Sequence, residues 1–208
     1  MKTIQWSTLS SHPLPAALAH STYGMRITEA LTALEESLIS GEQDKTLLLL
    51  ENDIIEDVFL IALERFLRYA QCHHLLVLVS KKNLAKMMRT WEHAVSWEDD
   101  RQLSALFQMT SMPQDAMEAQ VCITSVFDIQ MHISIAPTHP FFKGFDAIFV
   151  YDLSAIIGPA LYQIVDLFAV NETSVIGFSS LLSEEEGELL FGKVIERKCA
   201  SGPTLKHA

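Results

Sequence analysis

The sequence predicts an α/β fold in three layers, in which a parallel sheet is covered by helices on both faces. Short apolar runs of strand length alternate with amphipathic segments, which is the order expected of βαβ units. The runs are continuously apolar, as in strands that are buried on both faces. The chain has 208 residues, of which 49% are hydrophobic and 20% charged, enough for one domain with a substantial core. No internal repeat or linker divides it, so we expect a single domain.

The two ends of the chain are expected to lie outside this domain. Residues 1–22 are polar and include two prolines, which predicts a loosely attached arm. A first helix is expected over residues 25–39, because apolar residues recur there at three- and four-residue spacing, and Gly41 is expected to end it. The folded domain is predicted to occupy residues 23–198. Residues 199–208 are expected to form a frayed tail.

Seven apolar runs predict the strands of the sheet, the third and the last of them less clearly than the others. They cover residues 46–50, 75–79, 103–109, 120–124, 146–151, 174–178 and 193–197. Between them the apolar positions follow the helical period. Helices are therefore expected over residues 54–69, 82–95, 156–168 and 183–190, with a helical turn at Pro113, a helical or irregular segment up to residue 135 and a loop at 138–144.

The turn between the first strand and the following helix is unusually acidic. A strand, turn and helix in this order carry a glycine-rich loop and a lysine in many nucleotide-binding proteins, because glycine lets backbone N–H groups converge on the phosphates. This turn contains neither residue. Its positions are Glu51, Asn52, Asp53, Ile54, Ile55, Glu56 and Asp57. On the helix that follows, the residues expected to face the core are Ile55, Val58, Phe59, Ala62, Leu63 and Phe66.

The order of elements over residues 25–197 resembles the first RecA-like domain of superfamily 2 helicases and translocases, including type I restriction R subunits and DEAD/DEAH proteins. The segment LLLL-ENDIIED-VFLIALERFL is similar to the Walker A strand, loop and helix of that family. LLVLVSKKNLAKMMRTWEH resembles motif Ia, and GFDAIFVYDLS is similar to the Walker B strand. The resemblance implies a single RecA-like domain with the P-loop NTPase fold.

The motif positions themselves have changed. In this resemblance the Walker A lysine and threonine correspond to Glu56 and Asp57, and the Walker B acids to Tyr151 and Asp152. Ser154 stands where the family has histidine. The Ser/Thr-Ala-Thr motif corresponds to Phe178, Ser179 and Ser180. The resemblance therefore implies degenerate Walker motifs, no catalytic residues and no cofactor.

Elementary electrostatics points the same way. Two unit charges about 4 Å apart interact by about 4 kcal/mol at an effective dielectric of 20, so a glutamate in place of the lysine repels a triphosphate. Relatives also hydrolyse ATP between two such domains, with an arginine from the second. We expect no ATP hydrolysis by this chain alone. The first hypothesis is a catalytically inactive, helicase-like domain that serves as a protein-binding or regulatory module, with an implied link to DNA processing.

Two alternatives remain open from the sequence. The acids of the turn, together with Asp152, could hold Mg²⁺ or Ca²⁺; the competing interpretation is that acids simply favour a helix N-terminus, with Asn52 or Asp53 as N-cap. The other alternative is a nucleic-acid-binding accessory protein, because motif Ia touches the nucleic-acid backbone in relatives. Its contact residues would be Ser80, Lys81, Lys82, Lys86 and Arg89, although a solvated helix face explains them equally well.

The net charge and the cysteine content bear on where the protein is located and on what it binds. The formal net charge of −11 disfavours nonspecific attraction to nucleic acid or anionic membrane. The cysteines at positions 72, 122 and 199 form no CxxC pair, and no signal peptide or membrane span is recognisable, so a cytoplasmic location is expected. Neither the tryptophans at 91 and 97 nor the histidines at 73 and 74 suggest a site. We expect a protein partner, and the sequence is compatible with a homo-oligomer.

Overall fold

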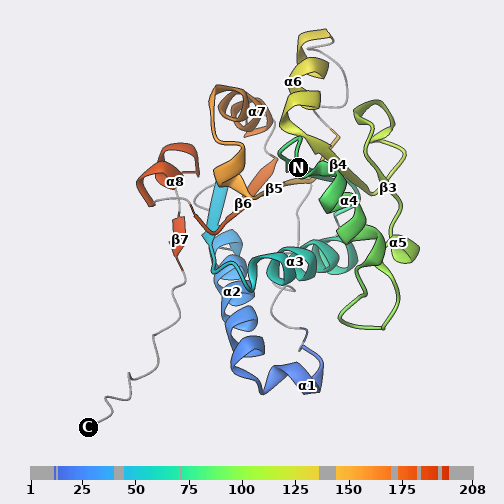
Figure 1. Ribbon diagram of the computed structural model, residues 1–208, viewed down its shortest axis with the longest axis vertical. Coiled ribbons are helices and arrows are strands. Elements are labelled where there is room, and N and C mark those ends of the chain that lie inside the picture. Colours follow the sequence, from blue (N-terminus) through green and yellow to red (C-terminus); the bar gives the residue numbers. More distant parts are fainter. Residues whose placement is uncertain are drawn as a thin grey trace.

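A computed structural model describes residues 12, 14–39, 45–70, 72–135, 144–169, 173–181, 184–191 and 194–196. These residues form a sheet of seven strands in the order β3-β4-β2-β5-β6-β1-β7, and every neighbouring pair is parallel (Figure 1). The strands are β1 Lys45–Leu49, β2 Leu75–Val79, β3 Met109–Thr110, β4 Val121–Ser125, β5 Ala147–Tyr151, β6 Ser174–Ser179 and β7 Val194–Glu196. The predicted three-layer α/β fold is confirmed.

The α-helices cover both faces of the sheet (Figure 1). They are α1 Ala16–Ala19, α2 Thr22–Ile39, α3 Ile55–Tyr69, α4 Leu84–His93, α5 Leu103–Leu106, α6 Val126–Ile135, α7 Pro159–Ala169 and α8 Glu184–Phe191. Short 3₁₀ turns lie at Pro113–Asp115 and Leu153–Ala155. Within the described ranges, no helix combines the length and the apolar character that crossing a bilayer would require.

The sheet separates two hydrophobic clusters. One face packs against α2, α3 and α4, and the other against α6, α7 and α8. At the centre of the first face, the ring of Phe59 on α3 lies 4.8 Å from Tyr151, 5.4 Å from Phe178 and 6.0 Å from Phe149, measured between centroids. The six residues of α3 that were expected to face the core are all buried, which confirms its predicted inner face.

One predicted strand is wrong. Residues 103–109 do not form a strand: Leu103–Leu106 is the short helix α5, and strand β3 begins only at Met109. Leu103 is buried and Leu106 packs partly against the same cluster, so the two apolar side chains face one side at three-residue spacing. That spacing fits a helical turn and not the two-residue period of a strand.

Part of the predicted N-terminal arm is attached to the domain. Leu14 is buried in the first cluster, and the His12 ring stacks on Tyr69 at 3.8 Å. The Arg65 side chain donates a hydrogen bond of 2.5 Å to the backbone carbonyl of His12. Residues 1–11 and the predicted tail at 199–208 lie outside the described ranges, as do Gly41 and most of the loop at 138–144.

Gly177 on β6 is a position of close approach. A Cβ atom there would lie 2.7 Å from Cζ of Phe191 and 2.9 Å from Cδ1 of Leu47. We expect Gly177→Ala to lower the free energy of unfolding by about 2 kcal/mol, because overpacking a tight core forces side chains from their preferred positions. Urea unfolding measures the change, and Ser174→Ala at the half-buried start of the same strand is the control. Equal stability of the two variants would show that Phe191 moves aside freely.

Candidate functional site

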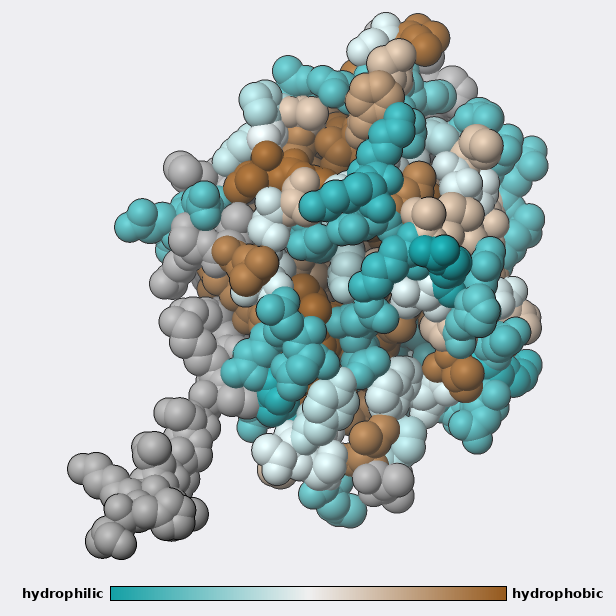
Figure 2. Space-filling model, viewed as in Figure 1, coloured by the Kyte–Doolittle hydropathy of each residue, from teal (hydrophilic) through white to brown (hydrophobic). Residues whose placement is uncertain are grey.

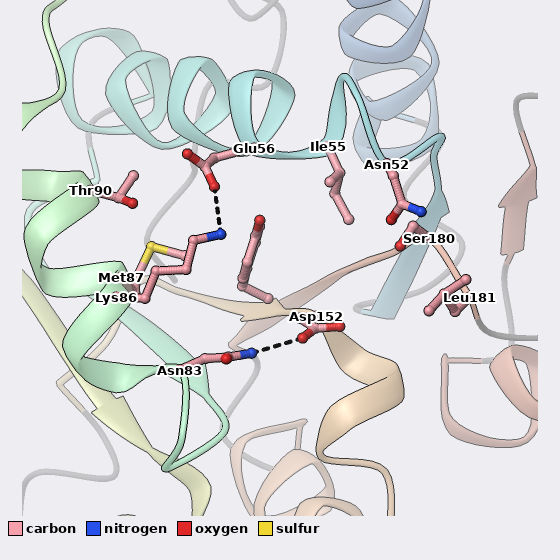
Figure 3. A pocket seen from close by; sticks show the side chains of 11 residues that line it. Asn52, Ile55, Glu56, Asn83, Lys86, Met87, Thr90, Asp152, Ser180 and Leu181 are labelled. Atoms are coloured by element: carbon pink, nitrogen blue, oxygen red, sulfur yellow. Dashed lines mark hydrogen bonds and ion pairs between the residues drawn. The ribbon is translucent and has the colours of Figure 1, made fainter.

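A pocket of about 310 Å³ opens at the carboxyl ends of the central strands. Its walls come from the turn after β1, the N-terminal part of α4, the end of β5 and the residues after β6 (Figure 3). Carboxyl ends of parallel strands meet at one edge of a sheet, and open α/β proteins bind their ligands in that crevice. The pocket thus lies where the acidic turn meets Tyr151 and Asp152 at the end of β5.

Two backbone N–H groups of the acidic turn form hydrogen bonds within the turn itself. The N–H groups of Ile54 and Ile55 both donate to the carbonyl oxygen of Glu51, at 3.2 Å each. No residue from 51 to 57 has a positive φ angle. A phosphate-binding loop needs free N–H groups that converge on an anion, commonly with glycine at positive φ. Two N–H groups of the turn are therefore engaged within it, and none of its residues has the positive φ that glycine commonly supplies to such a loop.

The expected N-cap is wrong. Helix α3 begins after Ile54, which occupies the N-cap position in a helical conformation and makes no capping hydrogen bond through its side chain. Neither Asn52 nor Asp53 caps the helix, because the Asp53 carboxylate binds the Arg26 guanidinium instead, with both hydrogen bonds at 2.8 Å. Hydrogen bonding to Arg26 lowers the pKa of Asp53.

Helix α2 supplies partners to three of the four acids. Arg26 forms ion pairs with Glu51 and Asp53. The Tyr23 hydroxyl lies within hydrogen-bonding distance of the Asp57 carboxylate and of the backbone carbonyl of Asp53. Burial, the hydrogen bond to Asp57 and the nearby carboxylates raise the pKa of Tyr23 to about 12, so its phenol remains a donor at neutral pH. None of these three acids lines the pocket.

The predicted acids do not converge on one point. Three bind side chains of α2, while Glu56 and Asp152 make separate contacts inside the pocket. Throughout the described part of the chain, no group of three or more His, Cys, Asp and Glu residues is arranged to hold a metal ion. This geometry gives no support to the alternative of a metal site built from the turn.

Two polar contacts span the pocket (Figure 3). Nζ of Lys86 on α4 lies 3.2 Å from Oε2 of Glu56 on α3. Nδ2 of Asn83, just before α4, donates to Oδ2 of Asp152 at 2.8 Å, and the Ser154 hydroxyl donates to Oδ1 at 3.0 Å. Asp152 has a φ angle of 55°, in the left-handed region, which directs the chain into the 3₁₀ turn that follows β5. These contacts connect the start of α4 to α3 on one side and to the segment after β5 on the other.

Tyr151, at the end of β5, forms part of the pocket wall. It is 8% exposed and lines the cavity, and no described residue forms a hydrogen bond with its hydroxyl. Burial and the charges of Glu56, Asp152 and Asp57 raise the pKa of Tyr151 well above its usual range. The phenol is therefore neutral at physiological pH and is available to a ligand.

The four cations among the residues predicted to contact nucleic acid are exposed. Ser80 is buried and is not a surface contact residue, which corrects its inclusion. Lys86 is paired with Glu56, and the Lys81 ammonium lies 4.4 Å from the ring centre of Phe127. Lys82 and Arg89 are exposed, and among the described residues neither side chain has an ion-pair partner.

The sequence analysis missed Tyr23, Arg26 and Asn83. Tyr23 and Arg26 precede their partners by 25 to 34 positions, and no local pattern connects the two segments. The sequence does show a cation, Arg26, on the helix before the acidic turn. That cation points to an ion pair only when α2 is known to pack beside the turn. Asn83 lies between Lys82 and Lys86, and only the lysines of this segment were considered as contact residues.

Comparison with known proteins supports the fold and goes no further. The sequence matches no protein-family model and no curated protein. The UvsW helicase from bacteriophage T4 is similar in structure, with 14% identity and a TM-score of 0.53, over 86% of this chain and 60% of that chain. The Hef helicase domain of Pyrococcus furiosus is similar over 78% of this chain and 37% of that chain, with 14% identity and a TM-score of 0.52.

These likenesses confirm the RecA-like helicase-domain fold that the sequence resemblance implied. This chain spans less than two thirds of the length of either structure. At this level of identity the two likenesses establish architecture alone, and activity has to be argued from the residues of the pocket.

Proposed function

We propose that this chain is a helicase-like domain that does not hydrolyse ATP by itself and acts as a protein-binding or regulatory module in the cytoplasm. The observation that carries the proposal is the ion pair between Glu56 and Lys86 in the pocket at the strand ends. The glutamate stands where the resemblance places the phosphate-binding lysine. The lysine that is present is already bound to it.

Electrostatics and backbone geometry both support a loss of nucleotide binding. Glu56 and Asp152 contribute two carboxylates to the pocket against one ammonium, from Lys86. The turn beside it engages the N–H groups of Ile54 and Ile55 in its own hydrogen bonds. Repulsion of about 4 kcal/mol between charges about 4 Å apart is enough to weaken triphosphate binding by roughly three orders of magnitude.

Exposed apolar residues support a role in protein contacts. Helix α6 exposes Phe127, Met131 and Ile135, which follow each other at four-residue intervals and therefore share one side of the helix. Hydrophobic atoms are visible at the top of the space-filling view, where α6 lies in Figure 1 (Figure 2). Contiguous exposed apolar side chains are typical of surfaces that bind another protein.

Thermal melting with nucleotide tests the proposal directly. A ligand at one hundred times its dissociation constant stabilises a protein by about 2.7 kcal/mol, which for a chain of this size raises Tm by roughly 5–10 °C. We expect no shift with ATP–Mg²⁺ or ADP–Mg²⁺ beyond that caused by Mg²⁺ alone. A nucleotide-specific shift, or ATP turnover by the purified chain, would overturn the proposal. A shift with Mg²⁺ alone would revive the metal site.

Nucleic-acid binding is the second candidate, favoured by the exposure of Lys82 and Arg89. If two cations contact phosphates, the logarithm of the affinity for duplex DNA falls with a slope of about −1.8 against the logarithm of salt concentration, or roughly tenfold between 50 and 200 mM. We expect at most this weak binding in fluorescence anisotropy, and its loss in a Lys82→Glu, Arg89→Glu variant. A steeper slope that survives both substitutions would place the contact elsewhere.

A further inference from the structure

We propose that the pocket at the strand ends is a receptor for a single nitrogen cation, a guanidinium or primary ammonium group. The inference deepens the proposed function and rests on it, because the pocket must be free of nucleotide. Such a cation is presented by an arginine or lysine side chain of a protein partner, or by a free alkylguanidine or alkylamine. The shared chemistry of these sources is a planar or tetrahedral cation on an apolar stem.

The charge of the pocket selects this class of ligand. Its lining contains the carboxylates of Glu56 and Asp152 and a single ammonium group, that of Lys86. Asn83 and Ser154 donate hydrogen bonds to Asp152 but do not neutralise its charge. The pocket therefore carries an excess negative charge. An anionic ligand would meet two carboxylates, whereas a cation compensates the excess.

The unpartnered phenol of Tyr151 is an independent sign of a ligand. More than nine tenths of this residue is buried, it lines the pocket, and no described residue binds its hydroxyl. Burial and the surrounding carboxylates raise its pKa, so the oxygen keeps its proton and also keeps lone pairs that can accept a hydrogen bond from a cationic N–H.

Lys86 shows that the pocket accepts an ammonium group. Its Nζ atom lies 3.2 Å from Glu56, yet the lysine side chain is 65% exposed and that of Glu56 41%. An exposed ion pair of this kind contributes little to stability, so an incoming cation can replace the lysine at small cost. Lys86 therefore acts as a tethered stand-in for the ligand.

The remaining walls suit the stem of such a side chain. Ile55 and Met87 are buried apolar residues of the lining, and Leu181 is an exposed one. Arginine and lysine place their methylene groups along apolar surface while the charged end reaches polar partners. The apolar side chains of the pocket can therefore contact the methylene groups, while Glu56 and Asp152 bind the charged end.

Titration with model compounds tests the inference. The probes are N-acetyl-arginine amide, its neutral citrulline analogue, butylguanidine and inorganic phosphate, followed by amide chemical shifts of the intact chain. We expect the arginine compound to shift resonances of the pocket residues, and the citrulline compound and phosphate to leave them unchanged. Equal responses to arginine and citrulline, or a response to phosphate, would overturn the inference. Tighter binding of the arginine amide than of butylguanidine assigns a peptide source, and equal binding a free cation.

Removing the stand-in lysine gives the sharpest prediction. Lys86→Met is expected to tighten arginine binding about three- to fivefold, because the ligand no longer competes with a tethered ammonium. Glu56→Gln and Tyr151→Phe are expected to weaken it, and Lys82→Met, at an exposed lysine without an ion-pair partner, serves as the matched control. Weaker binding in Lys86→Met, with native shifts elsewhere in the chain, would contradict the inference.

Titration with ATP–Mg²⁺ in the same experiment separates the two claims. If neither arginine nor ATP binds, the cation receptor is wrong and the non-hydrolysing domain is still supported. If ATP binds and shifts the same resonances, the proposed function fails, whatever arginine does.

Discussion

Replacing Phe59 by alanine is expected to lower the free energy of unfolding by about 3–5 kcal/mol, the usual cost of removing a large aromatic side chain from a core. The ring is 1% exposed and contacts Phe149, Tyr151 and Phe178 on two neighbouring strands. The substitution therefore leaves a cavity between α3 and the centre of the sheet. Unfolding in urea, monitored by circular dichroism, measures the loss as a fall in the midpoint at unchanged slope.

Phe127→Ala is the matched control for this experiment. Phe127 is 48% exposed on α6, and its ring contacts the ammonium of Lys81. An exposed cation–π pair is worth about 0.5–1 kcal/mol, so the control should lose no more than that. Losses of similar size in the two variants would mean that α3 does not pack as described.

The periodicity of apolar residues was sufficient to predict most of the fold. The run LLVLV predicted a strand at 75–79, and β2 occupies the same five residues. The six residues of α3 that were expected to face the core followed from three- and four-residue spacing, although the structure also buries the other residues from 58 to 67. The alternation of strands with helices then predicted a parallel sheet, which no pattern within a single strand contains.

Short elements were harder to predict because few residues carry the signal. Leu103–Leu106 has one helical turn, and a sequence of that length is compatible with both periods. Its helical state depends on contacts with α4, and those are tertiary. The capping error has a similar cause. Asp53 has the right chemistry for an N-cap, but Arg26 offers a charged partner that a local rule does not consider.

The candidate site was predicted in position but not in its contacts. The sequence placed the acidic turn and Asp152 at strand ends, and Glu56 of the turn lines one pocket together with Tyr151 and Asp152. It treated the four acids of the turn as equivalent. The structure separates Glu56, which lines the pocket, from the three acids that bind α2. That distinction depends on the packing of α2 beside the turn.

Glu64→Ala is expected to lower the free energy of unfolding by about 3 kcal/mol, because it removes a buried ion-pair partner of Arg68 and leaves two further hydrogen-bond donors without their acceptor. Glu64 is 1% exposed on α3. Its carboxylate accepts hydrogen bonds from Nε of Arg68 at 2.8 Å, from the Ser96 hydroxyl at 2.5 Å and from the N–H of Trp97 at 3.3 Å. The network thereby holds the segment after α4 against α3.

Arg68 limits the expected loss of stability in Glu64→Ala, because it remains paired with a second carboxylate, that of Asp99. It forms an ion pair of 3.0 Å with Asp99, and hydrogen bonds from Arg101, Arg68 and Ser96 hold the pKa of Asp99 well below its usual range. The guanidinium is therefore not left alone in Glu64→Ala, and the Ser96 oxygen still accepts from the N–H groups of Glu98 and Asp99. The Trp97 N–H and the hydrogen of the Ser96 hydroxyl do lose their acceptor. Glu29→Ala on the exposed face of α2 is the control and should change stability by less than about 0.5 kcal/mol. If Glu64→Ala is as mild as this control, the segment after α4 must be held by its apolar contacts, and Trp91 and Leu103 become the residues to substitute next.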